Sequence, residues 1–143
     1  MLKWDKRFLD LAQHISTWSK DMSTKVGAVI TRNKRLVSVG YNGFPEKVLD
    51  LTERYEDRAV KYKMIVHAER NAILFAQQSL VGCTLYTYPF GPCSVCAGMI
   101  IQAGISRCVF PRMSEDLKKR WGPDIEMAIK MFAEAGIEVF EME

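Results

Sequence analysis

Two kinds of hydrophobic pattern follow one another along the chain, and each predicts one kind of element. Apolar residues recur at helical spacing near the N-terminus, which predicts a helix from about Asp5 to Lys20. A continuous apolar run at 26–30 and a second strand-forming run at 35–40 follow, separated by the polar turn 31–34. Two such runs joined by a short turn predict an antiparallel β-hairpin.

The second part of the chain alternates helices with strands. Strand-forming residues predominate in the segments 83–88, 107–110 and 137–140. Helical patterns occupy the segments 64–78, 93–103, 113–120 and 123–135. Because a helix lies between consecutive strands, the later strands are predicted to pair in parallel. The predicted fold is α/β: a three-layer α-β-α sandwich with a mixed five-stranded sheet and helices on both of its faces.

The segment from Glu46 to Lys63 is long, charged and weakly periodic, and we interpret it as an exposed loop with a short helix. Its basic residues include Arg54, Arg58, Lys61 and Lys63, and two tyrosines, Tyr55 and Tyr62, lie between them. Loops of this length in a small domain often act as lids or bind a ligand. The segment is therefore also a candidate binding region.

Length and composition limit the function classes. The 143 residues suit one domain, 1–143, and 48% hydrophobic with 26% charged residues is ordinary for a globular protein. No apolar run approaches the roughly 20 residues that cross a bilayer, and the N-terminus has no signal-peptide core, so we expect no membrane partner and a cytoplasmic location. The net charge of +3 is too small to predict nucleic-acid binding.

Two short motifs carry the candidate chemistry, His67-Ala68-Glu69 and Pro92-Cys93-Ser94-Val95-Cys96. At the start of a helix, Cys93 and Cys96 place both sulfurs on one side of the same turn. Two thiolates and the imidazole of His67 form a donor set that suits Zn²⁺. Three protein ligands leave one coordination position open, which is typical of catalytic zinc, and Glu69 is placed to carry a proton. One zinc per chain is expected.

Other readings of these residues are weaker. A lone Cys-x-x-Cys also occurs in redox dithiols and structural zinc fingers, but the chain has no second such pair, and Glu69 has no role in a zinc finger. Cys83 and Cys108 fall in predicted strands, where buried packing is expected. His14 is expected to be an ordinary residue of the first helix.

The two motifs resemble those of the zinc-dependent nucleoside and nucleotide deaminases, whose signature is His-x-Glu followed by Pro-Cys-x-x-Cys. Further runs resemble the deoxycytidylate (dCMP) deaminase family: Ser23-Thr24-Lys25-Val26-Gly27, Gly40-Tyr41-Asn42-Gly43-Phe44-Pro45, Val66-His67-Ala68-Glu69, Thr84-Leu85-Tyr86 and Ile100-Ile101-Gln102-Ala103-Gly104-Ile105. Free cytidine deaminases usually have cysteine in place of His67.

The resemblance implies hydrolytic deamination of dCMP to dUMP and ammonia, in pyrimidine nucleotide biosynthesis. It implies that water attacks C4 of the cytosine ring while Glu69 protonates N3 and then the leaving amine. It also implies that Asn42 contacts the sugar and that Ala68 lies in the substrate site. Trp121 is the nearest candidate for a tyrosine that lines the pocket in many members, although it is equally a packing residue.

The phosphate of such a substrate needs polar and cationic partners. The polar Ser23-Thr24-Lys25 stretch enters the first strand close to the hairpin that carries Asn42, and its hydroxyls, a backbone N–H and one ammonium group are expected to bind a phosphate. Two alternatives stay open. In one, Ser23 and Thr24 only cap the turn and Lys25 is solvated; in the other, the basic segment before His67 holds the phosphate.

Other functions remain to be compared with dCMP deamination. A tRNA adenosine deaminase shares both zinc motifs and a Cys-Ala-Gly run like Cys96-Ala97-Gly98, but this chain lacks a strongly basic C-terminal helix. Deamination of another nucleoside or base, and a regulatory protein that keeps the fold, are further alternatives. The resemblance also implies activation by dCTP, inhibition by dTTP and assembly into a homo-oligomer.

Overall fold

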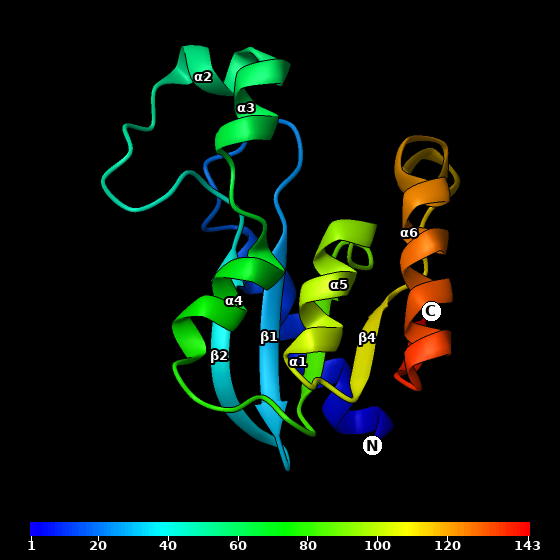
Figure 1. Ribbon diagram of the computed structural model, residues 1–143. Helices are drawn as coiled ribbons and strands as arrows, with labels where there is room; N and C mark the ends of the chain where they lie inside the picture. Colours follow the sequence, from blue (N-terminus) through cyan, green and yellow to red (C-terminus); the bar gives the residue numbers. More distant parts are fainter.

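A five-stranded sheet forms the middle layer of the computed structural model, which describes residues 1–143 (Figure 1). Its strands are β1 (Gly27–Arg32), β2 (Arg35–Tyr41), β3 (Thr84–Tyr88), β4 (Arg107–Pro111) and β5 (Glu138–Met142). They lie in the order β2-β1-β3-β4-β5. β1 pairs antiparallel with β2 and β3, whereas β3, β4 and β5 are parallel. The predicted mixed sheet, with its hairpin and parallel second part, is confirmed.

Helices cover both faces of this sheet. They are α1 (Leu2–Ser16), α2 (Thr52–Glu56), α3 (Arg58–Met64), α4 (Ala68–Ala76), α5 (Ser94–Gln102) and α6 (Glu115–Ala135). Alternate strand residues face opposite layers: Val29 and Tyr86 pack with α1, whereas Ile30 and Leu85 pack with α4, α5 and α6. The α2–α3 segment extends beyond one end of the sheet (Figure 1). None of the helices is both long and apolar enough to cross a membrane.

Several element boundaries differ from the sequence-based prediction. α1 ends at Ser16 instead of Lys20, so Trp18 lies beyond the helix and is 51% exposed. The 46–63 segment contains two short helices instead of one. The helix predicted from residue 64 begins only at Ala68, because Val66 is extended and pairs with Gly43 in an isolated antiparallel bridge.

The two helices predicted at 113–120 and 123–135 are one continuous helix, α6. Ser114 caps its N-terminus, since the hydroxyl accepts a hydrogen bond from the backbone N–H of Leu117. Pro123 lies inside the helix and removes one backbone donor. The prediction of a separate helix that starts at residue 123 was therefore wrong, whereas its predicted end at residue 135 is correct, because Gly136, with a φ of 80°, caps the helix there.

A buried carboxylate ties α1 to the sheet. Asp5 is 1% exposed and accepts hydrogen bonds from Tyr86 Oη at 2.8 Å and from both terminal nitrogens of Arg107, at 2.7 and 2.8 Å. Burial would raise the pKa of Asp5, but the hydrogen bonds from Arg107 and Tyr86 outweigh it and lower this pKa. The network therefore stabilises the fold with Asp5 ionised.

We expect Asp5→Ala to lower the free energy of unfolding by about 3–5 kcal/mol, because it leaves the Arg107 charge and the Tyr86 hydroxyl without their buried partner. Asp10→Ala on the same helix removes only an exposed pair with Lys6 and should cost less than about 0.5 kcal/mol. Urea unfolding measures both. The difference in the free energy of unfolding between wild type and Asp5→Ala should shrink as the pH falls below about 4, where the carboxylate of the wild type becomes protonated. Equal losses of unfolding free energy in Asp5→Ala and Asp10→Ala would contradict the prediction.

Candidate active site

His67 is positioned by the extended segment that leads into α4. Val66 exchanges two backbone hydrogen bonds with Gly43, at 2.8 and 3.1 Å, which fixes the chain just before His67. His67 is the N-cap of α4, with extended backbone angles. Its imidazole therefore projects from the start of the helix, and Glu69 follows in the first turn.

The two cysteines of the triad lie at the start of α5. Cys93 is the N-cap, and its sulfur accepts a hydrogen bond from the backbone N–H of Cys96 at 3.5 Å. Cys96 is fully buried in the first turn. Both ligand motifs therefore lie where helices begin, and the positive end of a helix favours thiolates at this position.

The three side chains converge. Nδ1 of His67 lies 3.2 Å from Cys96 Sγ and 3.5 Å from Cys93 Sγ, and the three donor atoms all lie within 4.8 Å of one another. A tetrahedral zinc ion with ordinary Zn–N and Zn–S distances requires N–S separations of roughly 3.5 Å. The donor types and their spacing therefore fit Zn²⁺, and His67, Cys93 and Cys96 form a zinc-binding triad for one ion per chain.

The two thiols of the triad differ in acidity. The pKa of Cys93 is lowered to about 4, chiefly by a hydrogen bond from Cys96, with a further contribution from His67 that together outweigh burial. The same hydrogen bond, followed by burial, raises the pKa of Cys96. These contacts favour the thiolate at Cys93, which is the form that binds metal.

Glu69 lies beside the triad without belonging to it. It is 4% exposed, and burial raises the pKa of its carboxyl group against the opposing charge of His67. Glu69 lines the same cavity as His67 and Cys93. A buried carboxyl group next to a metal can accept and return a proton, which is the role expected of Glu69 from the sequence.

The cavity beside the triad has a volume of about 550 Å³, which is large enough for a small-molecule ligand. Ile65, Val95 and Ile125 contribute apolar wall. Phe90 and Trp121 also line it, with ring centroids 5.9 Å apart. The indole N–H of Trp121 is buried and has no hydrogen-bond partner within the protein.

The structure brings together most of the substrate-site residues predicted from the sequence. Those that line the cavity are Ser23, Thr24, Asn42, Ala68, Glu69 and Trp121. Lys25 is different: its side chain is exposed and does not line the cavity. His14, Cys83 and Cys108 lie outside the metal-binding group, as expected, and both cysteines are buried.

The amide of Asn42 is occupied by the neighbouring loop. Its Oδ1 accepts a hydrogen bond from the backbone N–H of Val26 at 2.8 Å, and its Nδ2 donates to the carbonyl of Thr24 at 2.9 Å. Asn42 is 6% exposed. It therefore holds the 21–26 loop at the edge of the cavity.

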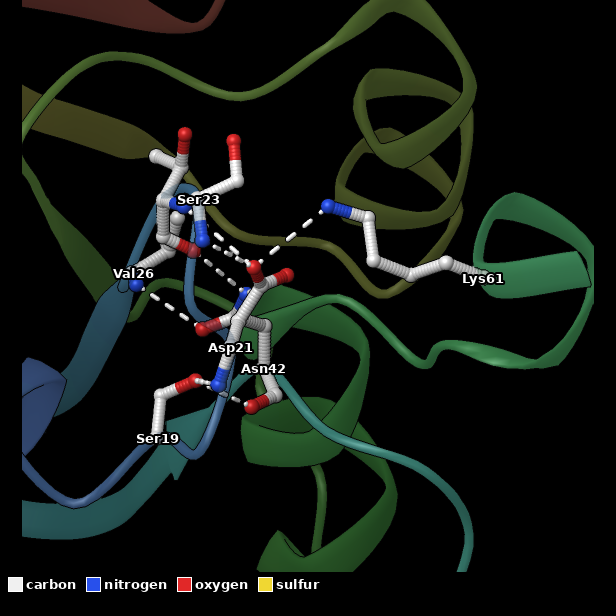
Figure 2. Close-up of polar contacts among 7 residues, drawn as sticks. Ser19, Asp21, Ser23, Val26, Asn42 and Lys61 are labelled. Atoms are coloured by element: carbon white, nitrogen blue, oxygen red, sulfur yellow. Dashed lines mark hydrogen bonds and ion pairs between the residues drawn. The ribbon is translucent and has the colours of Figure 1, made fainter. Parts of the chain in front are cut away.

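Sequence reasoning missed a buried ion pair in the same cavity. Lys61 of α3 lies with its Nζ 3.4 Å from Oδ1 of Asp21, and the two side chains are 7% and 4% exposed. Figure 2 shows the Lys61 ammonium group reaching toward Asp21, beside Ser23 and Asn42. The sequence makes the basic 46–63 segment a candidate binding region, but no periodicity distinguishes Lys61 from its exposed neighbours.

Comparison with known proteins identifies this arrangement. Residues 2–111 match the family model described as the cytidine and deoxycytidylate deaminase zinc-binding region. An uncharacterized deaminase from the luxG 3′ region of Aliivibrio fischeri is 49% identical over 137 residues, which cover 96% of this chain and 92% of that protein. A deoxycytidylate deaminase of Homo sapiens is 38% identical over 116 residues, covering 76% of this chain and 65% of the human enzyme.

Solved structures show the same fold. A dCMP deaminase from the cyanophage S-TIM5, in complex with dCMP and dUMP, superposes with a TM-score of 0.77 at 23% identity, covering 98% of this chain and 97% of that one. The match extends from the N-terminal helix to the last strand, so the three-layer architecture is common to both.

Proposed function

Because the chain belongs to the family of cytidine and deoxycytidylate deaminases, we propose that this zinc-dependent deaminase acts on dCMP and releases dUMP and ammonia. The observation that carries the proposal is the buried Glu69 carboxyl group in the same cavity as the zinc-binding triad. Relatives named deoxycytidylate deaminase, and a fold neighbour in complex with dCMP and dUMP, support this choice of substrate.

A zinc ion held by His67, Cys93 and Cys96 would supply Lewis acidity toward a water molecule. In the proposed reaction Glu69 takes a proton from a water molecule as the water oxygen attacks C4 of cytosine, and gives that proton to N3. Glu69 then moves the second proton from the attacking oxygen to the exocyclic amine, which leaves as ammonia. A positioned acid and base of this kind typically contributes about 10²–10⁴ in rate.

The cavity wall provides the remaining contacts in this proposal. Phe90 and Trp121 offer aromatic surface against the base, and the unpartnered indole N–H of Trp121 is a free donor. Ala68, fully buried at the start of α4, lets the base approach the helix end. Ser23 and Thr24 contribute hydroxyls at the part of the cavity proposed for the phosphate.

We expect kcat/KM for dCMP to exceed that for deoxycytidine by at least about a hundredfold. Two charge-assisted hydrogen bonds to a phosphate are worth roughly 1.5–3 kcal/mol each, and about 1.4 kcal/mol corresponds to a factor of ten. Ammonia release from each compound measures the ratio. Equal turnover of the two would assign the protein to nucleoside or base deamination, and turnover of tRNA adenosine alone would favour the RNA-editing alternative.

Glu69→Gln should keep one zinc per chain and lose about 10²–10⁴ in kcat, because Glu69 handles protons and does not bind the metal. Cys96→Ala should lose both zinc and activity. Cys83→Ala, a buried cysteine outside the triad, is the matched control and should keep both. Elemental analysis and dCMP turnover check the three variants. Loss of zinc in Glu69→Gln would show that its role has been misassigned.

Regulation by deoxynucleoside triphosphates is the second part of the proposal. A separate cavity of about 440 Å³ lies against residues 39–48, together with Lys20, so it includes the Gly40-Tyr41-Asn42-Gly43 run. We expect dCTP to activate and dTTP to inhibit dCMP turnover, in a homo-oligomer. Rate measurements across dCMP concentrations test this, and hyperbolic kinetics unchanged by either triphosphate would contradict it.

A further inference from the structure

Lys61 is a buried cation with few protein partners. An ammonium group has three N–H donors, yet the hydrogen bond to Asp21 Oδ1, at 3.4 Å, is the only one that Lys61 Nζ makes within the protein. The side chain is 7% exposed and lines the cavity beside the zinc triad. Because removing an ammonium group from water is unfavourable unless it is well paired, this position favours an additional anionic partner.

Asp21 does not depend on Lys61 for its own hydrogen bonds. Its carboxylate accepts the backbone N–H groups of Ser23 at 2.8 Å and Thr24 at 3.3 Å, as well as Asn42 Nδ2 at 3.4 Å. These contacts shape the 21–24 loop by themselves. The Lys61 ammonium is therefore an extra positive charge that Asp21 holds at the cavity.

The carboxyl groups of Asp21, Glu69 and Asp124 line the cavity, which offers an anionic ligand one lysine. Lys61 is the only lysine or arginine among the residues that line the cavity, and His67 is a zinc ligand. The hydroxyls of Ser23 and Thr24 line the same cavity and make no hydrogen bond within the protein. Ser23 lies beside the carboxylate that Lys61 approaches (Figure 2). Lys25 is exposed and outside the lining.

We infer that Lys61 of α3, with the Ser23 and Thr24 hydroxyls, binds the 5′-phosphate of the substrate and so determines the preference for a nucleotide over a nucleoside. The inference rests on the proposed function, since it assigns a residue to the phosphate of the dCMP-type substrate. Asp21 is the positioning residue in this arrangement: it holds the ammonium group in place and shapes the loop that carries both hydroxyls.

The test is the ratio of kcat/KM for dCMP to kcat/KM for deoxycytidine. We expect Lys61→Gln to reduce this ratio about 10- to 100-fold, mainly through KM for dCMP, as loss of one charge-assisted hydrogen bond predicts. Lys61→Arg, which keeps the charge, should retain most of the preference. Lys63→Gln, an exposed lysine two positions along the same helix, is the matched control and should leave the ratio unchanged. A merely structural defect would lower kcat/KM for dCMP and for deoxycytidine by the same factor and leave their ratio unchanged.

A second pair of variants guards against misfolding. Lys61→Gln leaves Asp21 as an uncompensated buried charge, so the double variant Asp21→Asn/Lys61→Gln is compared with Asp21→Asn alone. The double variant should again show the 10- to 100-fold lower ratio. A dCMP-to-deoxycytidine ratio that is unchanged in Lys61→Gln and in the double variant would overturn the assignment to Lys61. A ratio that falls in Lys25→Ala instead would also overturn it. Absence of any dCMP preference in the wild-type protein would contradict the proposed function itself.

Discussion

The close approach of α4 to β2 at Gly40 is the contact on which the active site depends. A Cβ atom at Gly40 would lie 2.4 Å from the carbonyl oxygen of Ala68 and 2.6 Å from the nitrogen of Ala72, distances that no side chain tolerates. Ala68 and Ala72 are themselves fully buried. Small residues on both elements thus allow the first turn of α4 to rest on the strand, which fixes the height at which His67 and Glu69 stand above the sheet.

A second helix end must meet the first for the metal site to form. α5 follows β3, which lies next to β1 in the sheet, so the strand order places the N-termini of α4 and α5 on the same face. Cys96 and Ala97 at the start of α5 are fully buried in the cluster that also contains Ala68. The same packing that forms the larger core therefore brings the imidazole of His67 within hydrogen-bond distance of the thiols of Cys93 and Cys96, which lie 26 and 29 residues further along the chain.

The parts of the molecule that could be predicted from the sequence are those with a local cause. The strands of the hairpin, the helices that follow Cys93 and precede Gly136, and the buried positions of Cys83 and Cys108 all follow from patterns within a few residues. Element ends were less predictable. Val66 is extended because it pairs with Gly43, a contact between distant segments, and α6 continues through Pro123 from the cap at Ser114, although the proline suggested a new start.

The residues of the candidate site also divide into those placed by a local pattern and those placed by contacts between distant segments. The zinc ligands and Glu69 have fixed spacing because each ligand motif lies within one helix turn. Lys61, in contrast, meets Asp21 across 40 residues, and nothing in the spacing of the basic 46–63 segment distinguishes it from Lys63. The Gly-Tyr-Asn-Gly run, on which the resemblance to dCMP deaminases partly rests, also stabilises the fold. Gly40 allows α4 to pack closely on β2, and Asn42 forms hydrogen bonds with the 21–26 loop. Motif resemblance therefore reports on the scaffold around the zinc-binding triad. The phosphate contact proposed for Lys61 depends instead on a charge whose position only the folded chain reveals.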